Sequence, residues 1–145
     1  MAVTVKRISL WRSEVANTPG ALAGVLKPLA EAGADLQVVM GYRYPGNEKK
    51  AAIEVFPVAG KKSLAAAGAA GLAASTIPTL RVVGDNKRGL GHAIAEAMAE
   101  VGINMGVLVA QVMGGKYTAI IGFDSEEDAD KATALIKKAS SVRRK

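Results

Sequence analysis

Two short turn sequences, each directly before a run of residues with helical periodicity, hold the groups of this chain that could bind a small molecule. They are Asn17-Thr18-Pro19-Gly20 and Asp85-Asn86-Lys87-Arg88-Gly89. A helix N-terminus offers unpaired N–H groups and a partial positive charge, so such a turn favours an anion such as a carboxylate. Gly20 and Gly89 would let a ligand approach the backbone closely. A ligand ammonium would need acceptors, which an Asn carbonyl oxygen or Asp35 could supply.

The two turns belong to an internal repeat. Asn17 and Asn86 are 69 positions apart, and the same offset relates further pairs: Gly20 with Gly89, Gly33 with Gly102, and Asp35 with Asn104. Phe56 and Phe123 are 67 apart, which predicts a second hairpin two residues shorter than the first. A recurrence at fixed spacing indicates one supersecondary unit used twice. We therefore predict repeats over residues 1–75 and 76–145.

The elements that position the first turn can be read from periodicity. Alternating apolar residues predict a strand over Val3–Trp11, although the alternation slips around Arg7. Thr18 is the expected N-cap of the following helix, and Pro19 fits the first turn. Gly33 is the expected end of that helix.

The remaining predicted elements complete the same order in both halves. They are two hairpins (Leu36–Tyr44 with Ala51–Phe56, and Asn104–Met113 with Lys116–Phe123), a helix over Gly60–Ala74, a strand over Thr79–Val83, a helix from Leu90 to Gly102 and a last helix after Asp124 or Ser125. A βαββα unit with a hairpin after its first helix requires an antiparallel sheet with helices on one face. We predict an α+β, ferredoxin-like fold of two βαββα(β) repeats.

Composition excludes several functional classes. The 145 residues include no cysteine, which excludes disulfides, cysteine-ligated zinc and a thiol nucleophile. The net charge of +6 is spread over both halves, and aromatic residues are only 4%. A single-strand nucleic-acid binder would need more stacking platforms. Apolar stretches are too short and too broken to span a bilayer, and residues 1–12 lack a signal-peptide core. We expect a cytoplasmic protein with no nucleic-acid or membrane partner.

No catalytic motif is complete. Gly114-Gly115-Lys116 is followed by Tyr117 rather than Ser or Thr, and Gly89-Leu90-Gly91 lacks the third glycine of a dinucleotide fingerprint because Ile94 stands there. His92 is the one histidine, and no nucleophile–base pair is visible. We expect no enzymatic activity, no cofactor and no metal site.

Two segments resemble the ACT domain, a small regulatory module that binds amino acids. They are Val15–Leu22 and Leu29–Leu36, which follow the family order of strand, Asn or Asp, any residue, Pro-Gly, any residue, Leu, and then a helix that ends in Ala-Gly, hydrophobic, Asn, hydrophobic. The second half is similar through Asp85–Gly89 and Glu100–Met105. The resemblance covers nearly the whole chain as a tandem pair.

The sequence departs from this pattern at four points. Arg88 stands where the second copy would carry Pro, Gly91 where it would carry Leu, and Asp35 where the first copy would carry Asn. The ACT fold also has a fourth strand, and Thr76–Gly84 is too short to serve both repeats. We therefore expect one or both units to lack the fourth strand.

The resemblance implies a ligand held across the interface of neighbouring domains. By position, the loop residues Asn17 and Asn86 and the residues after the helix stops, Asp35 and Asn104, would hold it. The full candidate set is Asn17, Thr18, Pro19, Gly20, Asp35, Asn86, Arg88, Gly89 and Asn104. Whether two loops meet within one chain or across a dimer is open. Taken alone, each Asn is also a common turn or capping residue.

Two functions fit this pattern. The first is a regulatory module that binds an amino acid or related metabolite, forms homo-oligomers and acts on a separate enzyme. The second is a partner subunit of such an enzyme with no ligand of its own. The departures at Arg88 and Gly91 favour the second, because a fold alone does not establish function.

Overall fold

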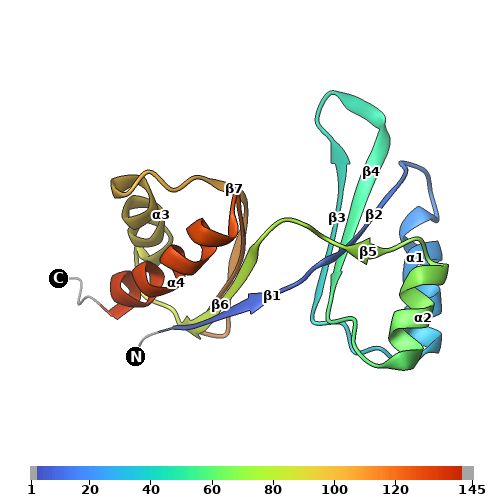
Figure 1. The fold of residues 1–145 in the computed structure, drawn as a ribbon, viewed down its shortest axis with the longest axis horizontal. Helices are drawn as coiled ribbons and strands as arrows, with labels where there is room; N and C mark the ends of the chain where they lie inside the picture. The colour runs from blue at the N-terminus through green and yellow to red at the C-terminus, as the bar shows by residue number, and fades with distance from the viewer. Residues whose placement is uncertain (1–2, 142–145) are drawn as a thin grey trace. The chain divides into compact units, whose positions relative to one another are not determined.

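The computed structural model describes residues 3–141, which form two compact units (Figure 1). The inserted unit is Ser9–Thr76. The terminal unit joins the residues up to Ile8 with those from Ile77 onward. Each unit holds one antiparallel four-stranded sheet and two helices, so the predicted α+β, ferredoxin-like fold of two repeats is confirmed.

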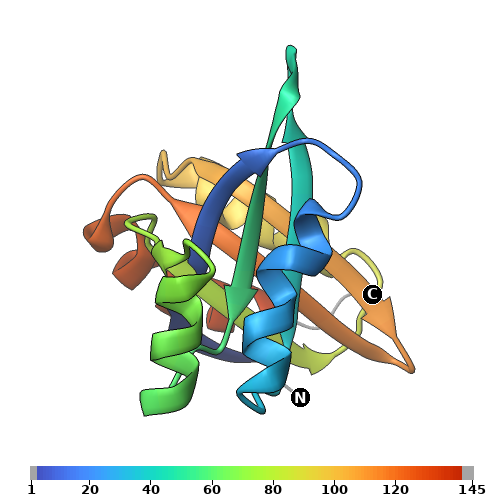
Figure 2. The same ribbon diagram turned by 90° about the vertical axis from the view of Figure 1, so that its right-hand side faces the viewer.

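The inserted unit has the order βαββαβ. Its elements are β2 (Trp11–Ala16), α1 (Ala21–Glu31), β3 (Val38–Tyr44), β4 (Asn47–Phe56), α2 (Lys61–Ala69) and β5 (Ala73–Ala74). The sheet order is β3-β4-β2-β5. Figure 2 shows α1 and α2 side by side over one face of this sheet. The core beneath them includes Val25, Leu29, Ile53 and Val55.

The terminal unit takes its fourth strand from the start of the chain. Its elements are β1 (Thr4–Ile8), β6 (Thr79–Asp85), α3 (Leu90–Glu100), β7 (Met105–Met113), β8 (Lys116–Phe123) and α4 (Glu126–Ser141), and its sheet order is β1-β6-β8-β7. The core includes Val5, Val82, Ile94, Ile121 and Ile136. No helix within residues 3–141 is both long and apolar enough to cross a membrane.

The predicted strand over Val3–Trp11 is two strands in two different sheets. It breaks at Ser9 and Leu10, and β1 then pairs with β6 while β2 pairs with β4. Arg7 explains the slip in the alternation, because its guanidinium forms ion pairs with Glu126 and with Asp130 (3.1 Å) on α4. The compact units therefore differ from the predicted repeats 1–75 and 76–145.

Both units have a fourth strand, so the expectation that one or both would lack it is wrong. In the inserted unit, β5 is two residues long and pairs with Trp11 and Arg12. In the terminal unit, β1 fills this place along Thr79–Val83. The segment from Thr79 serves the terminal unit, so no single strand is shared between the two.

Strand register fixes which positions of the two units correspond. Arg12 pairs with Glu54, and Arg81 pairs with Ile120, so β2 and β6 keep the offset of 69 while β4 and β8 are offset by 66. The second hairpin is therefore three residues shorter, not two. Phe123 belongs to the terminal core, whereas Phe56 corresponds to Gly122.

Candidate ligand-binding site

The two predicted turns have the same backbone geometry. The backbone N–H of Asn17 donates to the Lys49 carbonyl at 2.9 Å, and that of Asn86 donates to the Gly115 carbonyl at 2.9 Å. Each turn ends at a glycine with positive φ, 86° at Gly20 and 77° at Gly89, a conformation that glycine adopts without steric cost. The repeat in the sequence is thus a repeat in structure.

Gly20, and not Thr18, is the N-cap residue of α1. The Thr18 carbonyl instead accepts from the Ala21 N–H at 3.2 Å. No side chain caps α1 or α3. Because the first N–H groups of a helix have no partner within it, this end of α1 keeps its capacity to bind an anion.

The Asn17 side chain is held by the neighbouring hairpin. Its Nδ2 donates to the Glu48 carbonyl at 2.8 Å. A backbone carbonyl only accepts, so this bond uses the amide nitrogen of Asn17 and directs its carbonyl oxygen elsewhere. That oxygen can accept a hydrogen bond from a ligand ammonium.

A cavity of about 210 Å³ adjoins this turn. It lies between the start of α1 and strands β2, β4 and β3. Its lining is mostly small or apolar: Val15, Ala16, Asn17, Thr18, Ala21, Leu22, Gly41, Tyr42, Ala51, Ala52 and Ile53. No acidic or basic side chain lines it. The cavity and the helix terminus together form one concave site.

Small residues in register create the space. Ala51 pairs with Val15, and Gly41 pairs with Ile53. A Cβ placed on Gly41 would meet no heavy atom within 4 Å. Leu22 lines the cavity and remains 43% exposed.

Tyr42 lines the cavity without offering a free hydroxyl. Its hydroxyl donates to Glu54 Oε2 at 3.1 Å, and burial together with the Glu54 charge raises the pKa of Tyr42. Nearby, Arg12 and Glu14 both hydrogen-bond the Tyr44 hydroxyl, and the bond from Tyr44 lowers the pKa of Glu14. This network fixes the strand that forms one wall of the cavity.

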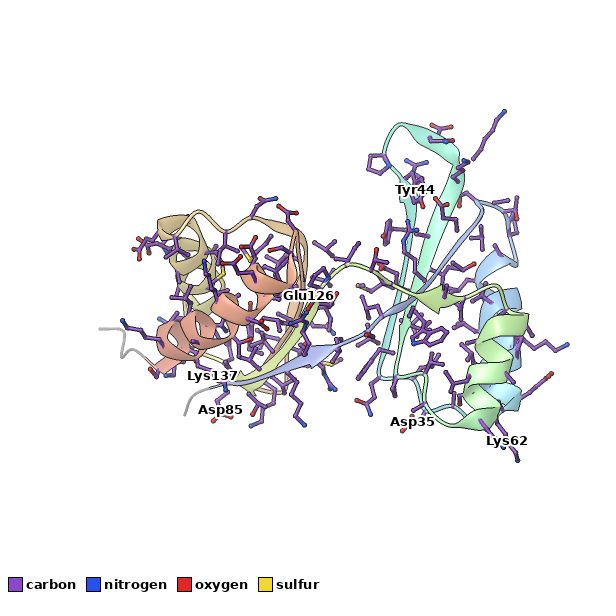
Figure 3. The ribbon with its side chains drawn as sticks, viewed as in Figure 1. Asp35, Tyr44, Lys62, Asp85, Glu126 and Lys137 are labelled. Atoms are coloured by element: carbon purple, nitrogen blue, oxygen red, sulfur yellow. The ribbon has the colours of Figure 1, made fainter. Side chains whose placement is uncertain are left out.

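Asp35 and Asn104 lie at the opposite helix end from the turns. An α-helix rises about 1.5 Å per residue, so the 11 residues of α1 separate Asp35 from Asn17 by roughly 16 Å. Figure 3 shows Asp35 near the C-terminal end of α1, whereas the turn that follows β2 lies at the N-terminal end. Asp35 and Asn104 are both exposed. Neither unit by itself brings these residues to its turn.

The predicted helix stops are confirmed. Gly33 donates to the Ala30 carbonyl at 3.0 Å and Ala34 to the Leu29 carbonyl at 3.0 Å, the two bonds of a Schellman motif. Gly102 and Ile103 repeat these bonds after α3, at 3.1 and 2.9 Å.

The terminal turn is tied down by charged groups. Lys87 Nζ donates to the Ser140 carbonyl at 2.8 Å, and Lys116 pairs with Asp85. The hydrogen bond and charge of Lys116 lower the pKa of Asp85. Asn86, Arg88 and Gly89 are exposed.

The sequence predicted the turn but missed the cavity. Gly41 and Ala51 carry no sequence pattern that predicts a cavity. A second cavity of about 230 Å³, between α3 and α4, touches neither turn. Within residues 3–141, no cluster of His, Cys, Asp and Glu could hold a metal ion.

Comparisons with known proteins give similarity of fold. The regulatory subunit of aspartate kinase from Thermus thermophilus matches with a TM-score of 0.65 and 20% identity, over 96% of this chain and 97% of that one. Protein BT0572 from Bacteroides thetaiotaomicron matches with a TM-score of 0.73 and 11% identity, over 95% and 99%. Aspartate kinase from Clostridium acetobutylicum matches with a TM-score of 0.58 and 15% identity, over 96% of this chain and 34% of that enzyme. No protein-family model and no curated protein matches the sequence. These similarities show a shared fold, the α+β, ferredoxin-like fold of two repeats.

Proposed function

We propose that this chain is a non-catalytic regulatory subunit that binds a small, uncharged amino acid or related metabolite at the inserted unit. The observation that carries the proposal is the cavity of about 210 Å³ beside the uncapped N-terminus of α1. A concave, mostly apolar site with a few convergent polar groups is the usual form of a small-molecule site.

Three groups of the ligand would bind at three places in the site. The carboxylate lies at the first turn of α1, where Gly20 permits close approach. The ammonium donates to the carbonyl oxygen of Asn17 and the hydroxyl of Thr18. The side chain enters the cavity, and a charged one is disfavoured because burying a charge without a partner is costly.

The other candidate residues enter through a second domain. Asp35 and Asn104 lie away from the turns, so we propose that they reach a ligand from a neighbouring copy. The turn of Asn86, Arg88 and Gly89 would be the second candidate site of the chain.

Oligomer formation is supported by the edge strand β7. Four of its residues are large, apolar and exposed: Leu108, Val109, Val112 and Met113. No charged residue or proline lies within Met105–Met113. Natural proteins protect such edges, so we propose that a second copy covers this one.

The regulated enzyme is a separate chain. The whole-length likeness to an aspartate kinase regulatory subunit supports this, and makes an aspartate kinase the first partner to test. The runner-up function, a partner subunit without a ligand, predicts the same enzyme contact and no response to amino acids.

A thermal unfolding screen tests the proposal. The protein is heated with each of the twenty amino acids at millimolar concentration. A ligand at 100 times its Kd stabilises the protein by about 2.7 kcal/mol, which is a shift of several degrees. The amide of the active amino acid is the control, because it lacks the carboxylate and should give no shift. No shift with any amino acid would reject the ligand and leave the runner-up.

A further inference from the structure

The position that opens the cavity in the inserted unit carries a tyrosine in the terminal unit. Val15 pairs with Ala51 between β2 and β4, and Gly84 pairs with Tyr117 between β6 and β8. The strand offsets of 69 and 66 make Ala51 and Tyr117 equivalent. Ala51 lines the cavity.

Tyr117 reaches across the equivalent space. Its side chain is 6% exposed and belongs to the terminal core. Its hydroxyl lies 3.9 Å from the place of a Cβ on Gly91. Gly91 is the counterpart of Leu22, which lines the cavity on the helix side. The tyrosine therefore spans from β8 to the first turn of α3.

The residues beside Tyr117, Gly84 and Gly91, are glycines, whereas their counterparts beside Ala51 are Val15 and Leu22. Tyr117 replaces Ala51 and Gly91 replaces Leu22, so two positions exchange volume together. A Cβ on Gly84 would come 2.7 Å from the Cα of Val3, so the residue directly before β1 packs against the Gly84 backbone. The burial of Tyr117 also raises its pKa. The space is filled by the protein itself.

We propose that the chain has one ligand site, in the inserted unit, and that Tyr117 is a built-in occupant that closes the corresponding site of the terminal unit. This inference rests on the proposed function. It assigns Asn86, Arg88 and Gly89 to the structure of the turn rather than to ligand binding. Each chain then binds one amino acid at most.

Calorimetric titration of the whole protein tests the inference, with L-alanine, L-valine, L-leucine and L-threonine as probes. We expect one site per chain. Asn17→Ala should weaken binding about tenfold, the effect of losing one hydrogen bond to a charged group, and Asn86→Ala should leave the Kd within about twofold. Two sites per chain, or equal losses in the two variants, would overturn the inference and leave the proposed function standing. Binding of none of the probes, together with no thermal shift from any of the twenty amino acids, would reject both.

A volume exchange gives a second test. Ala51→Tyr copies the terminal unit and should abolish binding, while Ala65→Tyr on the exposed face of α2 is the matched control and should not. Tyr117→Ala should add a second site. If Tyr117→Ala does not fold, the Ala51→Tyr variant tests the inference alone. Unchanged binding in a folded Ala51→Tyr variant would contradict the proposal that Tyr117 closes the site of the terminal unit.

Discussion

Ala51 and Tyr117 occupy equivalent positions on β4 and β8, opposite Val15 and Gly84. One lines a cavity of about 210 Å³, and the other is buried in the core of its unit. The two units thus differ in volume at this strand position, and also on the helix side, where Gly91 stands in place of Leu22.

The turn at Gly20 should depend on glycine. Gly20 has φ of 86°, where a side chain is strained, so Gly20→Ala should lower the free energy of unfolding by about 1 kcal/mol. Gly24 is the matched control, because it lies inside α1 with no atom within 4 Å of a Cβ. Gly24→Ala should raise that free energy by about 0.5–1 kcal/mol. Urea unfolding measures both, and a stabilised Gly20→Ala would contradict the turn geometry.

The packing of Val3, the residue directly before β1, against β6 should make Gly84 intolerant of a side chain. Its Cβ would meet the Val3 backbone at 2.7 Å, and backbone cannot rotate away. Gly84→Ala should cost about 1–3 kcal/mol of unfolding free energy, as overpacking does. Gly106→Ala is the control, because the atom nearest to its Cβ is at 3.8 Å. Equal stabilities of the two variants would argue against β1 in this sheet.

The ion pair of Asp85 and Lys116 should make a small pH-dependent contribution to stability. Lys116 lowers the pKa of Asp85 in the folded protein. Because the pKa of Asp85 is lower in the folded than in the unfolded protein, the ionised carboxylate stabilises the folded state at pH values above the unfolded pKa. This stabilisation is lost as the pH falls through the pKa of the folded protein. Because the pair is exposed, the effect is small. Lys116→Met should raise the Asp85 pKa toward its ordinary range of about 3.9, measured by NMR titration. An unchanged Asp85 pKa would show that the pair does not form.

The exposed edge strand predicts association. Val109 is 49% exposed on β7, and a lysine there would place a charge on the edge, a common device against pairing. Val109→Lys should therefore give monomers in sedimentation velocity. Leu64→Lys on α2, at a site 46% exposed, should keep the native oligomer. A native protein that sediments as a monomer would refute the proposed pairing.

Local patterns in the sequence predicted the local structure well. The glycine stops at Gly33 and Gly102, the hairpins and the two turns all depend on neighbouring residues, which a single sequence displays. The repeat then indicated two units of the same fold. The prediction of Thr18 as the N-cap was wrong, because the turn continues for two more residues and ends at Gly20, which has a positive φ.

Long-range pairing was not predictable in the same way. The alternation of Val3–Trp11 slips around Arg7, but nothing in the segment indicates that its two halves join different sheets. The cavity depends on register, because Ala51 and Gly41 matter only through the partners opposite them. The alignment of Phe56 with Phe123 gives an offset of 67 between the two hairpins, whereas the strand pairing gives 66. This difference of one residue hid the equivalence of Ala51 and Tyr117.

A ligand site in the inserted unit is tested most directly by an NMR titration of the ¹⁵N-labelled protein with the amino acid that most raises its unfolding temperature. We expect the largest amide shifts at the turn from Asn17 to Leu22 and at Gly41 and Ala51, and small shifts at Asn86 to Gly91. Shifts centred on Asn86 to Gly91, or on the second cavity between α3 and α4, would contradict a ligand site in the inserted unit.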